Sequence, residues 1–229
     1  IRIAQLYGCT VTPIELNEHI EDADQLQGVE RAATFVAIRM KQCYDLQQSD
    51  PSHWWANQLC NVDNTRVHRE HTGREILDQM GGGIDGWVAS VGTGGTLLGV
   101  SQALKEKHPK LKVTGVVPTD DPRIEWVRSR AVHKALAKFG IPELRFLIQD
   151  LLDANVMDNE VTVGNAEAKR MADRLCREEG LYCGMSSGAN VCAAIEMAKT
   201  MKKGSRIVTV VVDRRDRYFA EYPNEHYVV

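Results

Sequence analysis

The stretch Val91-Gly-Thr-Gly-Gly-Thr96 decides the fold of this chain. It closes an apolar run at 86–91, which predicts a strand, and it opens the segment 97–107, which predicts a helix. A glycine-rich turn between a strand and a helix lets backbone N–H groups converge on an anion. The helix dipole favours negative charge at the same place. The stretch therefore predicts a phosphate-binding loop, with a plain tight turn as the alternative.

The residue types within the loop suit an anion but not every phosphate ligand. Three positions lack a Cβ atom and two offer hydroxyl donors: Gly92, Gly94, Gly95, Thr93 and Thr96. The loop has no P-loop lysine, and its spacing departs from the G-x-G-x-x-G pattern of dinucleotide-binding loops. A nucleotide-binding Rossmann module also needs an acidic residue about 20 residues further on. Val117 stands there instead, so a nucleotide is disfavoured.

Strands and helices alternate outward from this loop. Continuous Val and Ile runs between helical patterns are typical of parallel strands that are buried on both faces. We therefore expect an α/β fold with a doubly wound, mostly parallel sheet. Strands are predicted at 9–14, 112–117, 160–163 and 206–212, and helices at 29–44, 68–80, 165–179 and 189–202. Residues 45–66 are predicted to form a connector, and 123–158 give no clear pattern.

The composition excludes several classes of protein. With 229 residues, 43% hydrophobic content and a net charge of −3, the chain can bury the core of one or two globular domains. Its charge gives no reason to expect nucleic acid or an anionic membrane as a partner. No apolar run approaches the ~20 residues that would span a bilayer.

The six cysteines are scattered and form no C-x-x-C pair, which favours reduced thiols and a cytoplasmic location. His68 and His71 share a helix face, but no third ligand is apparent, so no metal is expected. The chain begins at Ile1 rather than Met, and we expect it to be part of a longer protein.

A second glycine-serine turn lies at 183–190, again between a short apolar segment and a helical pattern. Ser186 and Ser187 would stand at the N-terminus of that helix, where serine is a good cap. In a doubly wound sheet, such loops face one crevice in which ligands bind. The two turns could thus hold opposite ends of one ligand.

Together, Gly92-Thr-Gly-Gly-Thr96 and Gly184-Met-Ser-Ser-Gly188 resemble the cysteine synthase and cystathionine β-synthase family, the fold-type II pyridoxal-phosphate enzymes. His68-Arg-Glu-His-Thr-Gly-Arg-Glu-Ile76 is similar to the family's segment ahead of the phosphate strand. The resemblance implies that 1–56 is the end of a small domain with a connector, and that 57–229 is the large domain that binds pyridoxal 5'-phosphate (PLP).

The resemblance also implies roles for individual residues. The phosphate cradle would be Gly92, Thr93, Gly94, Gly95 and Thr96. Ser186 matches the serine that bonds the pyridine nitrogen, and Gln58 matches a glutamine near the substrate carboxylate. For these two, the alternatives are a simple helix cap and a solvated loop amide. The family's Schiff-base lysine would precede Ile1, because none of the lysines in this chain occupies its place.

The implied reaction is β-replacement on an O-activated L-serine by sulfide or a thiol, giving L-cysteine or a related amino acid. The alternatives are a cystathionine-forming or β-eliminating enzyme, and a regulatory subunit that binds PLP without turnover. Relatives are often homodimers, and a small amino acid is the expected substrate. Arg214 and Arg215 replace small residues of the family pattern near the pyridine end; surface charge is favoured over a role toward an anionic substrate.

Overall fold

The structure is a computed structural model that describes residues 2–14, 19–20, 23–119 and 123–217. The chain divides into two compact units, which are described separately below. The first comprises Ile1–Asn57 with Glu125–Leu144, and the second Gln58–Ile124 with Arg145–Val229. The expected division after residue 56 differs from this one in the segment 125–144, which belongs to the first unit. The assignment of the units to small and large cofactor domains stays a prediction.

The first unit is helical in the part that the structure describes. Helix α2 (Gly28–Ser49) packs against α7 (Ala131–Lys138), and Ile38 is buried between Phe35 and Phe139. The unit also contains α1 (Arg2–Leu6), η2 (Ala23–Gln25) and most of α6 (Arg123–Arg128). The strand predicted at 9–14 is wrong, because these residues are irregular and pair with no strand among the described residues.

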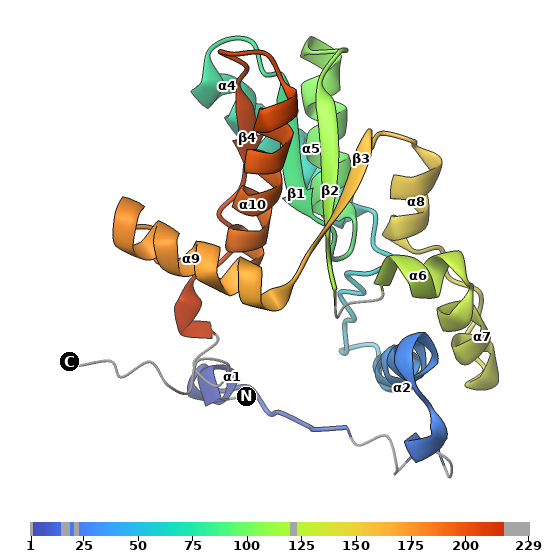
Figure 1. The fold of residues 1–229 in the computed structure, drawn as a ribbon. Coiled ribbons are helices and arrows are strands. Elements are labelled where there is room, and N and C mark those ends of the chain that lie inside the picture. Colours follow the sequence, from blue (N-terminus) through green and yellow to red (C-terminus); the bar gives the residue numbers. More distant parts are fainter. Residues whose placement is uncertain (1, 15–18, 21–22, 120–122, 218–229) are drawn as a thin grey trace. The chain divides into compact units, whose positions relative to one another are not determined.

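The second unit contains a parallel four-stranded sheet in the order β3-β2-β1-β4 (Figure 1). Its strands are β1 (Gly86–Ser90), β2 (Lys112–Pro118), β3 (Asn159–Val163) and β4 (Ile207–Thr209). All three strand pairings are parallel. The α/β class with a parallel sheet is therefore confirmed. The predicted last strand is shortened to three residues.

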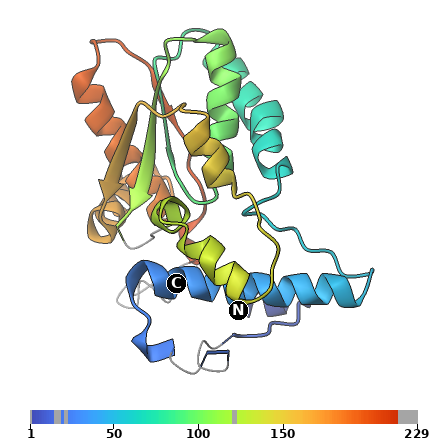
Figure 2. The same ribbon diagram turned by 90° about the vertical axis from the view of Figure 1, so that its right-hand side faces the viewer.

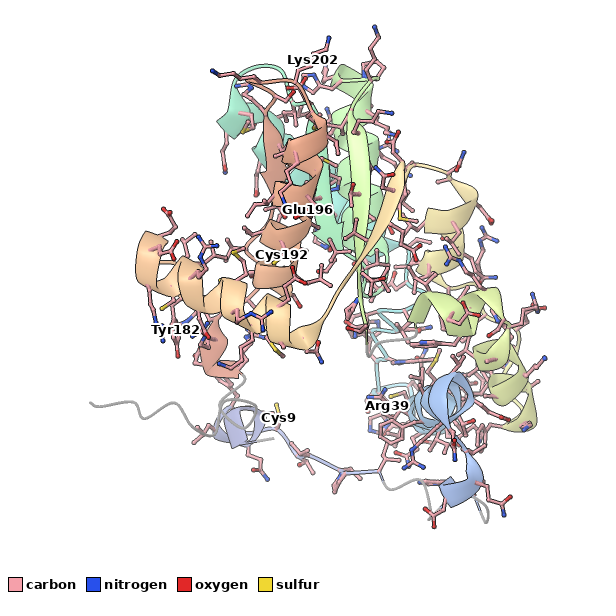
Figure 3. The ribbon with its side chains drawn as sticks, in the orientation of Figure 1. Cys9, Arg39, Tyr182, Cys192, Glu196 and Lys202 are labelled. Carbon is pink, nitrogen blue, oxygen red and sulfur yellow. The ribbon has the colours of Figure 1, made fainter. Side chains whose placement is uncertain are left out.

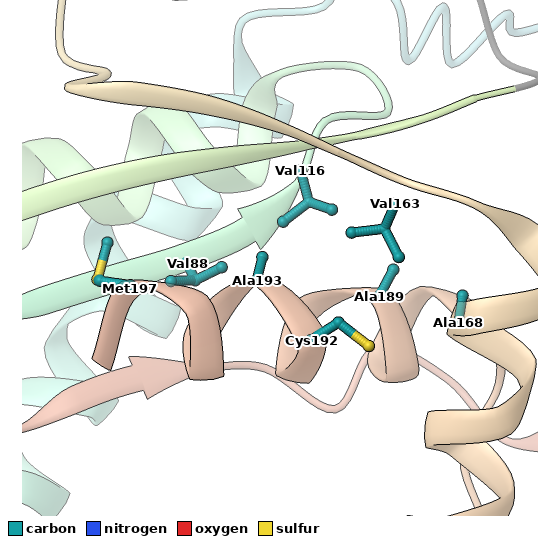
Figure 4. Packing of buried hydrophobic residues seen from close by; sticks show 8 residues of the cluster. All are labelled: Val88, Val116, Val163, Ala168, Ala189, Cys192, Ala193 and Met197. Carbon is teal, nitrogen blue, oxygen red and sulfur yellow. The ribbon is translucent and has the colours of Figure 1, made fainter. Parts of the chain in front are cut away.

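Helices cover both faces of this sheet, as alternate residues of β1 show. Trp87 is fully buried and donates from Nε1 to the carbonyl of Leu97 in α5 (Gly95–Lys107). The next residue, Val88, belongs to a cluster with residues of α10 (Met185–Thr200) (Figure 4). Helix α9 (Asn165–Glu179) packs in turn on α10. Because β1 is buried on both faces, it reads as a continuous run of small and hydrophobic residues, whereas the edge strand β3 is polar and exposed at Asn159, Glu160 and Thr162.

Both helices that follow glycine turns begin earlier than predicted. Helix α5 starts at Gly95, and α10 starts at Met185. The small residues that the sequence places in a loop therefore form the first helical turns. The segment 123–158, which gave no clear pattern, contains α6, α7 and α8 (Leu147–Asp153). No helix within the described ranges combines the length and the apolar character that a membrane crossing requires.

The helix predicted at 68–80 is the larger, later part of a segment that begins at Asp63 and runs alongside α5 (Figure 2). It consists of α3 (Asp63–Val67), a π-helical turn η3 (His68–Thr72) and α4 (Gly73–Met80). Glycines permit the close contact. A Cβ atom on Gly99 would lie 2.3 Å from the carbonyl oxygen of Thr65, and one on Gly73 would lie 2.5 Å from the Cβ of Ala103.

The tightest glycine contact joins α9 and α10, where a Cβ on Gly188 would lie 2.0 Å from the carbonyl oxygen of Ala168. We expect Gly188→Ala to lower the free energy of unfolding by about 1–3 kcal/mol, because backbone must move to accept the methyl group. Gly83→Ala is the matched control, since its Cβ would have only Arg206 Nη2 nearby, at 3.8 Å. Urea unfolding measures both; equal effects would contradict this account of the packing.

Candidate anion-binding site

The glycine-rich loop and the glycine-serine turn lie at the same edge of the sheet. Met197, near the end of α10, lies beside the beginning of β1, because a Cβ on Gly86 would be 2.5 Å from its Sδ. Ala189, near the beginning of α10, lies with Val163 at the end of β3 (Figure 4). The N-terminus of α10 therefore points to the carboxyl ends of the strands, where 91–95 leaves β1. The chain leaves β1 for α5 on one face, whereas α10 covers the other, as at the ligand crevice of doubly wound folds.

The first turn of α5 presents hydrogen-bond donors. Gly94, at its N-cap, has a φ of 91°, a conformation that favours glycine, and as glycine it has no capping side chain of its own. The N–H of Leu98 donates to the carbonyl of Gly94 at 3.0 Å. The N–H of Gly95 donates to Thr93 Oγ1 at 3.3 Å. The N–H groups of Thr96 and Leu97 lie in the first turn of the helix, where backbone donors have no intrahelical acceptor. This turn can therefore bind an anion.

Asn64 connects this loop to the predicted substrate residue. Its Nδ2 donates to the carbonyl oxygen of Gln58 at 2.9 Å and to Thr93 Oγ1 at 3.1 Å. A Cβ atom at Gly95 would lie 2.5 Å from Asn64 Oδ1, so only glycine fits beside this amide. Thr93 Oγ1 thus accepts two hydrogen bonds, from Asn64 and from the N–H of Gly95. Its own hydroxyl proton points elsewhere and is available to a ligand.

The second hydroxyl of the loop is held by His68. Its Nε2 lies 3.0 Å from Thr96 Oγ1, and its Nδ1 lies 3.0 Å from Thr72 Oγ1, four residues further along the same segment. Burial lowers the pKa of His68, which keeps the imidazole neutral at pH 7. A neutral imidazole between two hydroxyl groups accepts from one and donates to the other.

The glycine-serine turn contains one fully buried serine and one that is half-buried. Ser187 is fully buried, and its Oγ accepts a hydrogen bond from the N–H of Val212 at 2.9 Å. Asn190 Nδ2 donates to the carbonyl oxygen of Val210 at 3.1 Å. These bonds hold the start of α10 to the chain that leaves β4. Ser186 is half-buried on the same first turn, and the structure records no hydrogen bond for its hydroxyl among the described residues.

The two arginines that follow β4 differ sharply. Arg214 is exposed, with 76% of its side chain accessible, and pairs with Asp216 at 3.2 Å. Arg215 is buried, and its Nη2 lies 2.7 Å from Asp173 Oδ1 in α9. Its guanidinium also lies 5.9 Å from the ring centroid of Tyr182, in the loop between α9 and α10 (Figure 3). The prediction of surface charge therefore fits Arg214 and is wrong for Arg215.

Sequence reasoning missed the supporting residues of the loop. Asn64, His68 and Thr72 follow one another at intervals of four, which places them on one helical face. Gly95 and Gly99 share the same spacing on α5, and small residues at that spacing indicate close helix contact. These two patterns together were the available signal. His68 is accounted for by two hydroxyl contacts rather than by a pairing with His71, which is exposed.

A family described as pyridoxal-phosphate dependent enzymes matches residues 1–213. The chain belongs to this family. Cysteine synthase B of Pseudomonas aeruginosa is 35% identical over 164 residues, covering 72% of this chain and 50% of that protein. Cysteine synthase of Staphylococcus aureus is 37% identical over 164 residues, covering 71% of this chain and 51% of that protein. The chain thus spans about half the length of these relatives.

The solved structures agree with this family. An O-acetylserine-dependent cystathionine β-synthase from Helicobacter pylori superposes with a TM-score of 0.65 at 26% identity. The match covers 79% of this chain and 57% of that one. The resemblance to the cysteine synthase and cystathionine β-synthase family is therefore confirmed, together with the fold class.

The cofactor of this family is PLP, and the first turn of α5 fits its phosphate. The N-cap of the helix is a glycine in a left-handed conformation, so no side chain of the N-cap residue occupies the first turn. Two threonine hydroxyls flank the turn, and each is already held by a neighbour in the protein, Asn64 or His68. A dianionic group would meet backbone and hydroxyl donors there without displacing a side chain.

Arg215 and Arg214 provide a matched pair for a stability test. We expect Arg215→Met to lower the free energy of unfolding by about 2 kcal/mol, because it removes the buried one of the two cations that pair with Asp173 and leaves only the more exposed Lys169. Arg214→Met removes an exposed pair and is expected to change stability by less than about 0.5 kcal/mol. Urea unfolding of both variants checks this; a small effect at Arg215 would show that its burial has little energetic importance.

Proposed function

We propose that the chain is the cofactor-binding part of a PLP-dependent enzyme that carries out β-replacement on an O-activated L-serine, such as O-acetyl-L-serine. Sulfide or a thiol would be the nucleophile, and L-cysteine or a related amino acid the product. The observation that carries the proposal is the first turn of α5, where backbone donors and two held hydroxyls converge at the carboxyl edge of the sheet. The names of the similar proteins, cysteine synthase among them, support the reaction type.

In this proposal the phosphate lies against the loop. The cradle is formed by Gly92, Thr93, Gly94, Gly95 and Thr96. When bound, PLP supplies an electron sink for the bonds at the α-carbon of an amino acid. The loop residues anchor the phosphate end, and the ring would extend from there toward the start of α10. Because the donors are fixed by Asn64 and His68, binding requires little reordering of the loop.

The other two predicted site residues are given the following roles. Ser186, a half-buried residue on the first turn of α10, would bond the pyridine nitrogen through its hydroxyl. A hydroxyl partner does not favour a protonated ring as a carboxylate would, and this suits removal of an α-proton coupled to loss of a β-substituent. Gln58 has an exposed side chain, and its backbone is tied to the loop through Asn64, which supports a role at the substrate carboxylate.

We further propose that the full protein supplies the Schiff-base lysine from a segment preceding Ile1. Residues 1–56 would then be the end of a small domain with its connector, and 57–229 the large PLP-binding domain. A homodimer in the cytoplasm is proposed from the family resemblance and from the scattered, unpaired cysteines. Light scattering of the purified protein would measure the number of subunits.

The reaction is tested by supplying the purified natural protein, with PLP, with O-acetyl-L-serine and sulfide. We expect L-cysteine at a rate well above the uncatalysed reaction, measured by chromatography of the amino acids. Ser186→Ala is expected to reduce turnover with a smaller effect on PLP affinity, since it leaves the phosphate donors in place. Ser205→Ala, at a half-buried position in the turn that follows the C-terminal end of α10, is the control.

Other outcomes would replace the proposal. Pyruvate and acetate in place of cysteine would indicate β-elimination, and cystathionine formed with homocysteine would indicate a cystathionine synthase. Reduction with borohydride and peptide mapping locates any lysine that holds the cofactor. PLP bound without a labelled lysine or turnover would contradict catalysis and leave a regulatory subunit.

A further inference from the structure

The π-helical turn η3 gives His68 an unusual position. The N–H of Gly73 bonds to the carbonyl oxygen of His68, five residues earlier, rather than to the residue four earlier. Turns of this kind are rare and often occur at functional sites. Here the widened turn is pressed against α5, where a Cβ on Gly99 would lie 2.9 Å from the Cβ of His68. The backbone of both segments thus fixes where the imidazole lies.

The imidazole lies between two hydroxyl groups and has only one proton when neutral. If Thr72 donates to Nδ1, then Nε2–H donates to Thr96 Oγ1, and the Thr96 hydroxyl proton is left for a ligand. In the opposite tautomer, the Thr96 hydroxyl donates to Nε2 and presents only oxygen lone pairs to an anion at the first turn of α5. An anion is attracted by the first arrangement and repelled by the second. The same reasoning applies to Thr93, whose oxygen already accepts two hydrogen bonds.

We propose that His68 is a positioning residue for the phosphate of the cofactor. The relay Thr72–His68–Thr96 fixes the imidazole as the Nε2–H tautomer, so that the Thr96 hydroxyl donates to the bound phosphate. This role rests on the proposed function, since it requires the phosphate to lie at the first turn of α5. It goes further because it proposes that His68 and Thr72, which lie outside the glycine loop, fix the direction in which the Thr96 hydroxyl donates.

Charged groups on the neighbouring helix do not take over this task. Arg69, adjacent in sequence, pairs with Glu106 of α5 at 2.8 Å, and Arg74 pairs with the same carboxylate at 2.9 Å. Both arginines are therefore engaged along the outer side of α5. His71 is exposed, whereas His68 is half-buried and in contact with the loop. Within the described segment 63–80, His68 and Asn64 are the residues that contact a loop hydroxyl.

The test compares two substitutions of His68, each of which keeps a hydrogen-bonding group near only one of the two imidazole nitrogens. The amide of Gln can place a donor near the Nε2 position, whereas the shorter Asn reaches only the Nδ1 position. We expect His68→Asn to weaken binding of PLP to the natural protein about tenfold, the effect of one hydrogen bond to a charged group. His68→Gln is expected to restore most of that loss. His71→Asn, at the exposed histidine, is the matched control and should leave affinity unchanged.

The phosphate dependence separates this role from a merely structural one. Pyridoxal has the same ring without the phosphate, so its affinity should be equal in wild type, His68→Asn and His68→Gln. The side-chain ¹⁵N spectrum of His68, assigned by its loss in the variants, should show the Nε2–H tautomer when PLP is bound. Thr72→Val should weaken PLP binding without changing pyridoxal binding, because it removes the donor to Nδ1.

Each contrary result has a distinct meaning. If wild type binds PLP and pyridoxal equally well, the proposed phosphate site at the first turn of α5 is wrong, and the proposed function fails along with the relay. If wild type prefers PLP but His68→Asn retains that preference, the relay alone is overturned. Equal losses for PLP and pyridoxal in His68→Asn, or an Nδ1–H tautomer in the loaded protein, would also overturn it.

Discussion

The close contact between α5 and the segment 63–80 is the constraint on which the site depends. Glycine at 73 and 99 removes the Cβ atoms that would keep the two helical segments apart. Only at this distance do Asn64 and His68 reach the hydroxyls of Thr93 and Thr96. The contact thus converts a glycine-rich loop, which would otherwise have many conformations, into one fixed arrangement of donors.

This arrangement has an electrostatic logic. The N-terminus of α5 carries the positive end of a helix dipole, and no acidic side chain lies in its first turn. The supporting groups are a neutral amide and a neutral imidazole rather than cations. Anion binding then depends on directed hydrogen bonds, which are selective for geometry, more than on net charge. A chain with a formal charge of −3 can hold a phosphate in this way.

The sequence predicted the parts of the fold where local pattern and tertiary position agree. The loop at 91–96, the buried strands beside it and α9 all follow from hydrophobic runs and glycines. The strand expected at 9–14 failed because a strand needs a partner, and local pattern does not report one. The helices at 123–153 were missed since their apolar residues are interrupted by Pro142, Gly140 and charged residues.

The site, like the fold, could be predicted from the sequence only in part. The glycine and threonine positions follow from the chemistry of anion binding, and family resemblance added Ser186 and Gln58, whose roles stay predictions. Asn64, His68 and Thr72 were not recognised as supporting residues, because their four-residue spacing places them on one face but does not show that Asn64 and His68 contact the loop hydroxyls. Arg215 was misread because its partner, Asp173, is 42 residues away in sequence, and charge pattern alone does not reveal burial.

The account is tested most directly by a crystal structure of the natural protein with PLP bound. We predict phosphate oxygens within hydrogen-bond distance of the N–H groups in the first turn of α5 and of Thr96 Oγ1, with Asn64 and His68 in their present contacts. A phosphate bound elsewhere, or a first turn of α5 filled by a protein side chain, would contradict the central claim.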